Sequence, residues 1–469
     1  MAALNEDITA LVEEVRNFCA RHGIAESTFG RHAVNDGKLV SRISSGSWIE
    51  EETARRVHDF MERAERGEVA LRGRPKRKKS DSNATKMAEL ISSESSVRTP
   101  GSFAFHEQRQ RFHIFANTTN ESWVVADRVA TELADVSPGP DGFRLLYTPM
   151  DNGIILTRTL RALHALHPDV PVLVVMKGRG LEDLRNTMGR LVDRITEHPL
   201  SVFVMTNMYL REAVDLTKRS GDNPENVVWR NLALEGRRSY DFQGQVAGLY
   251  GELAREWLVH QGENAQPVYA VPSVVTIYRL DQESGLQSIL PTPGDPELRY
   301  NYALLNHPYL HSHTMTFRLD YVLRPVFDRL AAGGRMTVIQ GYPRDPAHEL
   351  VGRIWPEQAL PVISRYDVIR DLRKDLAGEG FTVSGLTDTN ALFRFDMHTL
   401  PVLEGHNLGT QSLSAAFNNA VYFAQVREEL VQDAIREGRR YLEITEQVLR
   451  ENGGLWFVNE AFSVTRKGA

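Results

Sequence analysis

Apolar side chains recur every three or four residues in the first part of the chain, which is the spacing of one helix face. In residues 7–21 they form a continuous apolar side that ends before Gly23. Shorter stretches with the same period follow. The pattern predicts an all-α N-terminal domain over residues 1–67, with helices at 7–21, 25–34, 38–44 and 49–66.

A different pattern begins at about residue 103, where short apolar runs alternate with amphipathic helical stretches. Such alternation predicts an α/β domain with a mostly parallel, Rossmann-like sheet and right-handed crossovers. This domain is expected to span 103–469, with an insertion near 236–298 and a helical C-terminal cover at 412–452. The predicted strands are 143–148, 170–176, 200–206, 226–234, 300–306, 334–340 and 455–467.

Residues 68–102 lack a strong apolar period and have the composition of a linker. The linker opens with the basic run RGRPKRKK at 72–79, although the whole chain of 469 residues has a formal charge of −6. Any affinity for nucleic acid must therefore come from a local basic surface.

Composition also limits the cellular compartment and the kinds of chemistry that we expect. The only cysteine is Cys19, so no intrachain disulfide forms. The N-terminus has acids where a signal peptide carries positive charge, and no apolar run approaches the ~20 residues that span a bilayer. We expect a cytoplasmic, nucleoid-associated protein with no membrane contact.

The segment 38–44 combines an apolar side with an exposed polar and basic one. Val40 and Ile43 are expected to point inward, whereas Lys38, Ser41 and Arg42 point outward. Over about residues 5–65 the chain resembles the lambda-repressor-like helix-turn-helix family, with a longer turn whose glycine is displaced to Gly37. The resemblance implies that the three outward side chains contact DNA in the major groove. A helical bundle that mediates assembly remains the alternative.

The basic run has a shape as well as a charge. Gly73 lets the backbone approach a groove floor and Pro75 keeps it extended. Narrow A·T-rich minor grooves attract inserted arginine. The stretch resembles an AT-hook, which implies minor-groove contacts from Arg72, Gly73, Arg74, Pro75 and Lys76. DNA is then the expected partner, with a homodimer favoured because one helix-turn-helix rarely supplies enough specific contact.

The larger domain resembles the class I S-adenosylmethionine-dependent methyltransferases over roughly residues 120–467. The clearest part is FRLDYVLRPVFDRLAAGGRMTVIQ at 317–340, followed by a last strand at 455–467 that ends the domain in an antiparallel hairpin, as in that family. The resemblance implies S-adenosylmethionine as the cofactor.

Two registers place the expected cofactor loop. The favoured one takes 170–176 as the first strand, so Gly178 and Gly180 would contact the cofactor and Asn207 would stand at the ribose-binding position. The alternative takes 143–148, with the loop Thr148–Gly153 and Lys177 at the ribose position. Neither has an intact motif, and glycines that only turn a strand into a helix remain an open interpretation.

The loop LLNHPYLH at 304–311 follows the predicted fourth strand. It resembles the Asn-Pro-Pro-Tyr motif of amino-group methyltransferases, with His307 in place of the first proline. The resemblance implies that Asn306 and Tyr309 hold the methyl acceptor. A loop in which Tyr309 only packs is the alternative. No metal site is expected, because the histidines here lack an acidic or cysteine partner.

Two functions remain open from sequence. In the first, the protein is a DNA-binding regulator whose methyltransferase-like domain senses a ligand. In the second, it is an active methyltransferase acting on DNA, a protein or a small molecule.

Overall fold

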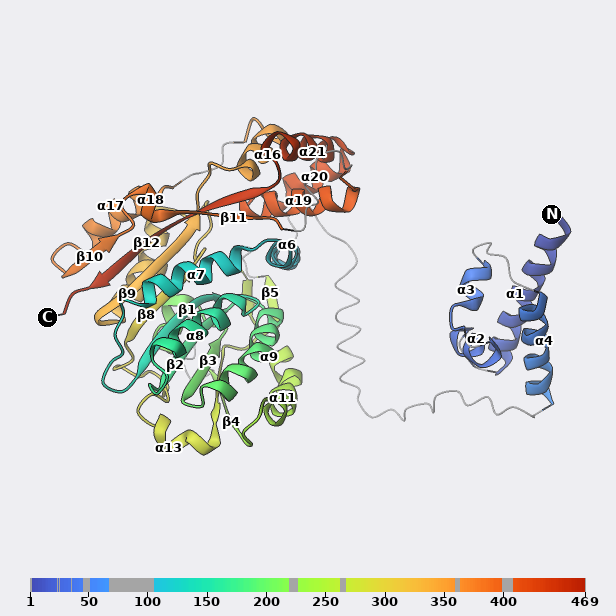
Figure 1. Cartoon of the computed structure of the whole chain (residues 1–469), viewed down its shortest axis with the longest axis horizontal. Helices are drawn as coiled ribbons and strands as arrows, with labels where there is room; N and C mark the ends of the chain where they lie inside the picture. The colour runs from blue at the N-terminus through green and yellow to red at the C-terminus, as the bar shows by residue number, and fades with distance from the viewer. Residues whose placement is uncertain are drawn as a thin grey trace. The chain divides into compact units, whose positions relative to one another are not determined.

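The computed structural model describes residues 2–22, 24, 26–34, 36–44, 51–66, 105–218, 227–261, 267–358, 363–398 and 408–468. The chain divides into two compact units, Met1–Gly101 and Ser102–Ala469 (Figure 1). The predicted AT-hook, with Arg72, Gly73, Arg74, Pro75 and Lys76, lies outside the described residues.

Within the described residues, the N-terminal unit has four helices at the predicted places. They enclose an apolar core that includes Val15, Phe18, Phe29 and Val57. The Phe29 ring packs edge-on against Phe18, with 5.5 Å between centroids. The helices are α1 (Ala2–His22), α2 (Glu26–Val34), α3 (Leu39–Ser44) and α4 (Glu51–Glu65).

The turn between α2 and α3 is tight because of Gly30. A Cβ at this position would lie 2.2 Å from the carbonyl oxygen of Asp36, so a larger residue would push the turn away from α2. Asp36 N donates to Gly30 O, which closes the turn. The short polar helix α3 is thereby held against the core.

The C-terminal unit is built on one large mixed sheet, mostly parallel in its centre. Within the described residues its main path runs β10-β12-β9-β8-β1-β2-β3-β7-β4, and β11 pairs with β12. The strands are β1 (Phe143–Met150), β2 (Val172–Gly178), β3 (Ser201–Thr206), β4 (Val228–Leu234), β7 (Ser273–Arg279), β8 (Tyr300–Asn306), β9 (Leu330–Gly341), β10 (Phe381–Ser384), β11 (Leu392–Asp396) and β12 (Trp456–Arg466). A separate antiparallel pair joins β5 (Val259–Gln261) to β6 (Pro267–Tyr269).

The last strand of the chain is antiparallel to its neighbours, as the resemblance implied. β12 runs antiparallel to both β9 and β10, next to the parallel series β3-β2-β1-β8-β9. The domain is therefore α/β with a Rossmann-like sheet that is mostly parallel in its centre.

Helices cover both faces of this sheet, which explains why the central strands are apolar on both sides. One face is covered by α7 (Glu121–Leu133), α8 (Ile154–Leu166), α9 (Leu181–Glu197), α11 (Ser239–Gly248) and α12 (Tyr250–Glu256). The other face is covered by segments that include α13 (Glu283–Leu286), η2 (Leu319–Leu323), α15 (Arg324–Asp328) and α17 (Arg365–Asp375).

A third apolar cluster joins the C-terminal helices to α6 and α16, which gather at one end of the unit in Figure 1. Its helices are α6 (Phe105–Thr118), α16 (Pro346–Ile354), α19 (Thr410–Phe423) and α21 (Arg440–Asn452), with α20 (Glu428–Arg436) beside them. The remaining short elements are α10 (Leu210–Ala213), η1 (Leu280–Gln282), α14 (Met315–Arg318) and α18 (Asp388–Ala391).

The strand order shows that the preferred register, with 170–176 as the first strand, was wrong. β1, not 170–176, lies at the point where the strand order reverses, with β2 on one side and β8 on the other. The stretch 226–234, expected beside β3, forms the edge strand β4 because β7 of the insertion intervenes. Pairing of β1 with β8 joins residues more than a hundred positions apart, so local patterns could not reveal it.

Among the described residues, no helix is long and apolar enough to cross a bilayer. The same part of the chain contains no group of three or more His, Cys, Asp or Glu side chains placed to hold a metal ion.

Candidate functional site

The exposed side of α3 carries the side chains predicted to contact DNA. Lys38, Ser41 and Arg42 are exposed, whereas Val40 and Ile43 are buried, as the periodicity predicted. Arg42 Nη2 lies 2.8 Å from Asp36 Oδ2, and the Ser41 hydroxyl donates to Lys38 O. The helix therefore presents a polar and basic side on a packed scaffold.

In the larger unit, strand topology indicates where a ligand would bind. Open α/β sheets bind ligands outside the carboxyl ends of their strands, where the strand order reverses. That place is the end of β1, between β2 and β8. Three loops border it, and we name it the switch crevice: residues 151–153 after β1, 177–180 after β2 and 306–309 after β8.

The loop after β1 caps the helix that follows it. Asp151 accepts hydrogen bonds from the Tyr147 hydroxyl at 2.7 Å and from Gly153 N at 2.7 Å. Burial raises the pKa of Asp151 to about 6, against the hydrogen bonds that lower it. Asn152 Oδ1 accepts from Ile154 N, while its buried Nδ2 has no hydrogen-bond partner. The first amides of α8 are thus already occupied, but one amide donor remains free.

The predicted cofactor glycines follow β2 rather than the central strand. A Cβ on Gly178 would lie 2.5 Å from the Trp257 ring and 2.6 Å from Met150 Cε. Trp257 and Met150 therefore cover the side of Gly178 on which a Cβ would lie. Gly180 N donates to Asp183 Oδ2 at the start of α9, and Arg109 forms an ion pair with the same carboxylate. Both glycines serve the strand-to-helix turn, which was the open alternative.

Asn207 holds the chain rather than facing the crevice. Its Nδ2 donates to Val271 O at 2.9 Å, and its Oδ1 accepts from Ser273 N at 2.9 Å. The side chain is fully buried. These bonds fix the entry to β7, an element that sequence reasoning placed inside an insertion, and they use the groups that a ribose would need.

Asn306 is the predicted site residue whose contacts leave it available. It ends β8 with 8% of its surface exposed, and its buried Oδ1 has no hydrogen-bond partner. The next residue, His307, has a φ of 46° and bonds through Nε2 to Glu121 at 2.8 Å. An unsatisfied buried amide oxygen is costly, and it marks a place where a ligand donor would be stabilising.

Tyr309 is placed differently from the prediction. It is only 4% exposed, its hydroxyl donates to Gln340 Oε1 at 2.6 Å, and the Arg318 guanidinium lies 4.3 Å from the ring centroid. Burial raises its pKa above the ordinary value. The ring is thus occupied by protein contacts, in agreement with the alternative of a packing tyrosine.

Two cations lie at the switch crevice; sequence analysis placed Lys177 at the ribose position of the alternative register and gave Arg179 no role. Lys177 is near the carboxyl end of β2 and Arg179 directly follows the strand, where Arg179 Nη2 donates to His307 O at 3.2 Å. This bond joins the β2 and β8 loops across the end of β1. The available signal was the KGRG sequence itself, in which two basic residues alternate with two glycines directly after a buried strand.

The crevice fits S-adenosylmethionine only in part. The orphaned amide atoms of Asn152 and Asn306 fit a polar ligand at the ends of β1 and β8. Lys177, however, stands where the family resemblance places a carboxylate for the ribose hydroxyls. The only glycine of the β1 loop, Gly153, faces α9, since a Cβ there would lie 3.0 Å from Thr187 Cα.

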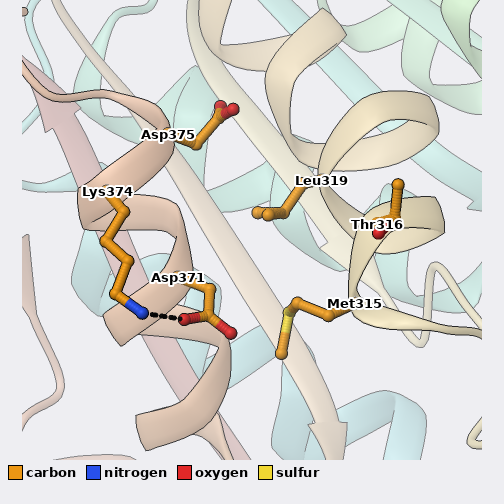
Figure 2. A pocket seen from close by; sticks show the side chains of 6 residues that line it. All are labelled: Met315, Thr316, Leu319, Asp371, Lys374 and Asp375. Atoms are coloured by element: carbon orange, nitrogen blue, oxygen red, sulfur yellow. Dashed lines mark hydrogen bonds and ion pairs between the residues drawn. The ribbon is translucent and has the colours of Figure 1, made fainter.

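Two pockets lie elsewhere on the unit. One, of about 480 Å³, lies between the α14–η2 segment and α17, where Asp371 accepts from Lys374 (Figure 2). Another, of about 270 Å³, is lined by stacked His164 and His198, whose ring centroids are 3.9 Å apart. Neither contains a residue of the switch crevice.

Comparisons with known proteins give distant likenesses in structure. No family model matches, and no curated protein matches the sequence. A loganic acid methyltransferase structure with SAH has a TM-score of 0.26 at 10% identity, covering 79% of this chain and 99% of that one. An uncharacterised protein from Burkholderia thailandensis has a TM-score of 0.24 at 16% identity, covering 81% and 90%.

A phosphoethanolamine N-methyltransferase 2 from Haemonchus contortus has a TM-score of 0.18 at 7% identity, covering 74% of this chain and 100% of that one. TM-scores this low carry no argument. Strand order and direction show that the described part of Ser102–Ala469 is an α/β unit with a mixed sheet that is parallel in its centre.

Proposed function

We propose that the α/β unit is an S-adenosylmethionine-dependent methyltransferase that acts on an amino group in the switch crevice. The observation that carries this proposal is the orphaned Oδ1 of Asn306 at the carboxyl end of β8. An amide oxygen in this position accepts a hydrogen bond from an acceptor N–H and orients the nitrogen lone pair.

Asn152 Nδ2 supplies a complementary donor after β1. A bound S-adenosylmethionine would supply an electrophilic methyl group for the acceptor nitrogen, and Asn306 and Asn152 are the residues that would hold the ligand. The protein's own contribution is orientation, because Asn306 and Asn152 fix the two sides of the ligand.

Calorimetric titration of the full chain with S-adenosylmethionine tests this proposal. We expect binding at sub-millimolar concentration, and transfer of labelled methyl groups that Asn306→Ala abolishes. Asn301→Ala is the matched control: Asn301 lies on the same strand, but its Oδ1 accepts from Arg144 N and its Nδ2 donates to Ser137 O. Absence of cofactor binding at millimolar concentration would overturn the enzyme assignment.

A second proposed function is DNA binding by residues 1–79. The exposed side of α3, with Lys38, Ser41 and Arg42, supports it. Acidic residues outnumber basic ones in 1–66, so the attraction depends on this side and on the basic arm at 72–79. In this proposal the arm contributes A·T-rich minor-groove contacts and the protein is a homodimer.

The full chain lacking 72–79 provides the test in fluorescence anisotropy with A·T-rich and G·C-rich duplexes. We expect weaker binding, a shallower dependence on salt and loss of the A·T preference. Unchanged affinity and preference would refute the minor-groove assignment.

A further inference from the structure

Lys177 and Arg179 are two cations at the switch crevice that no carboxylate compensates. Lys177 Nζ donates to the carbonyl of Gly178 at 2.7 Å, and Arg179 donates to the carbonyl of His307 at 3.2 Å. Within the part of the chain that the structure describes, neither forms an ion pair. The hydrogen-bond partners of both cations are therefore neutral carbonyl oxygens, and the nearby Asp183 acts on them electrostatically without an ion pair to either.

Two nearby acids are already engaged. Asp183 pairs with Arg109, and Glu121 Oε1 accepts from His307 Nε2 at 2.8 Å and from Asn459 Nδ2 at 3.1 Å. Pairing of Asp183 or Glu121 with Lys177 or Arg179 would break one of these buried contacts. Two other acids, Asp151 and the exposed Glu182, form no ion pair with either cation among the described residues.

Burial makes this arrangement energetically unfavourable without a ligand. Desolvation lowers the pKa of Lys177 to about 7, and Arg179 and Arg109 add repulsion to it. Burial also lowers the pKa of Arg179. Taking a charged group out of water costs roughly several kcal/mol, unless an opposite charge or good hydrogen bonds compensate this cost.

The surrounding side chains supply further polar contacts. The Tyr269 hydroxyl donates to Arg179 O at 2.8 Å, which holds the loop, and Lys177 Nζ lies 5.5 Å from the Tyr269 ring centroid. Tyr422 of α19 and Arg109 of α6 are electrostatic neighbours of Arg179. Arg111 and Asn418 hydrogen-bond α6 to α19, two helices that lie together in Figure 1.

Arg179 retains most of its hydrogen-bonding capacity. A guanidinium has five N–H donors in a planar fork, and one is used on His307 O. Planar forks suit carboxylate and phosphate oxygens, which accept two parallel bonds. Helix N-termini, the usual anion sites of such folds, are capped here by Asp151, Asn152 and Asp183. The side-chain cations are thus the available anion donors.

We propose that Lys177 and Arg179 bind an oxyanion, so that the small molecule accepted by the switch crevice carries a carboxylate or a phosphate group. The identification of that molecule as a methyl acceptor rests on the proposed function; the oxyanion site itself does not. Asn306, next to His307, then faces the same ligand at a neutral part of it.

Sulfate and acetate test the site on the full chain, because neither titrates between pH 6 and 9. Thermal unfolding and calorimetry at constant ionic strength should show saturable stabilisation in the wild type. Arg179→Gln and Lys177→Gln should each weaken sulfate binding about tenfold, which corresponds to about 1.4 kcal/mol. Preference for sulfate points to a phosphate-bearing ligand, and preference for acetate to a carboxylate.

Arg436→Gln is the matched control, since Arg436 is exposed on α20 and pairs with Asp433 at 3.0 Å. Its anion response should equal that of the wild type. Equal responses of the wild type and Arg179→Gln would overturn the oxyanion site. Titration of the same samples with S-adenosylmethionine separates the two proposals: an anion response without cofactor binding refutes only the proposed function, and the reverse refutes only the oxyanion site.

Discussion

Two arginines in the α/β unit, the buried Arg365 and the half-buried Arg179, differ in how their charge is compensated. Arg365 bonds to Glu460 through Nη1–Oε2 at 2.9 Å, and its Nε donates to Gly385 O at 3.1 Å. Arg179 has a carbonyl partner and no carboxylate. Arg365 connects α17 to β12, so this buried arginine stabilises the fold. The unpaired Arg179 lies where strand order reverses, and this difference separates a packing ion pair from a ligand-binding cation.

The largest expected effect comes from breaking the structural pair. Glu460→Ala removes the buried carboxylate partner of Arg365 and leaves the more exposed Asp388 as its remaining ion-pair partner, so it should destabilise the α/β unit by about 3 kcal/mol. Arg179→Met should destabilise the unit by no more than about 1 kcal/mol, because it removes one hydrogen bond together with a charge that has no ion pair. Urea unfolding followed by tryptophan fluorescence measures both, since five of the six tryptophans lie in this unit.

The double variant Arg365→Met with Glu460→Leu serves as the control and should recover much of the loss. A cost below about 1 kcal/mol for Glu460→Ala would remove the contrast between the two arginines.

A smaller effect should appear at Asp151, a buried carboxyl held by neutral donors. Its pKa is raised to about 6 from an ordinary value of 3.8, with Asp183 and Glu121 as nearby acids. The native state therefore binds this proton more tightly than the unfolded state, so the carboxyl's contribution to stability falls as the pH rises from about 4 to about 6.

Asp151→Asn should flatten this dependence by about 2 kcal/mol across that interval. Urea unfolding at pH 4 and pH 7 gives the difference, with Asp433→Asn as an exposed control. Identical pH slopes in the wild type and Asp151→Asn would show that Asp151 has an ordinary pKa.

The smallest expected effect is the pH dependence of sulfate binding at Lys177, and it tests the proposed oxyanion site. The groups facing Lys177 are Arg179, Arg109 and Asp183. Because its lowered pKa is about 7, Lys177 is charged below that pH, and sulfate affinity should fall as the pH rises from 6 to 9. A fall of severalfold, up to about tenfold, is expected by calorimetry. Lys177→Arg remains charged, so its sulfate affinity should stay constant; a parallel fall in both proteins would assign the titration elsewhere.

The sequence predicted the elements of the fold well, because their signals are local. Apolar spacing located the N-terminal helices and the central strands, including the buried Val40 and Ile43. The strands β5, β6 and β7 of the insertion, together with β10 and β11, were missed, since most of them are short and β7 pairs with distant strands. The candidate site was predicted only in part: Asn306 remains available, whereas Gly178, Gly180, Asn207 and Tyr309 are used by the packing.

The sequence by itself determined which segments become helices and strands, and that a basic arm follows a small helical domain. Tertiary structure decided which strand lies at the centre, because the β1–β8 pairing joins distant residues. It also decided that Trp257 covers Gly178 while Arg179 reaches His307. Residue types state what each group can bind, but only packing determines which groups already have partners and which are left for a ligand.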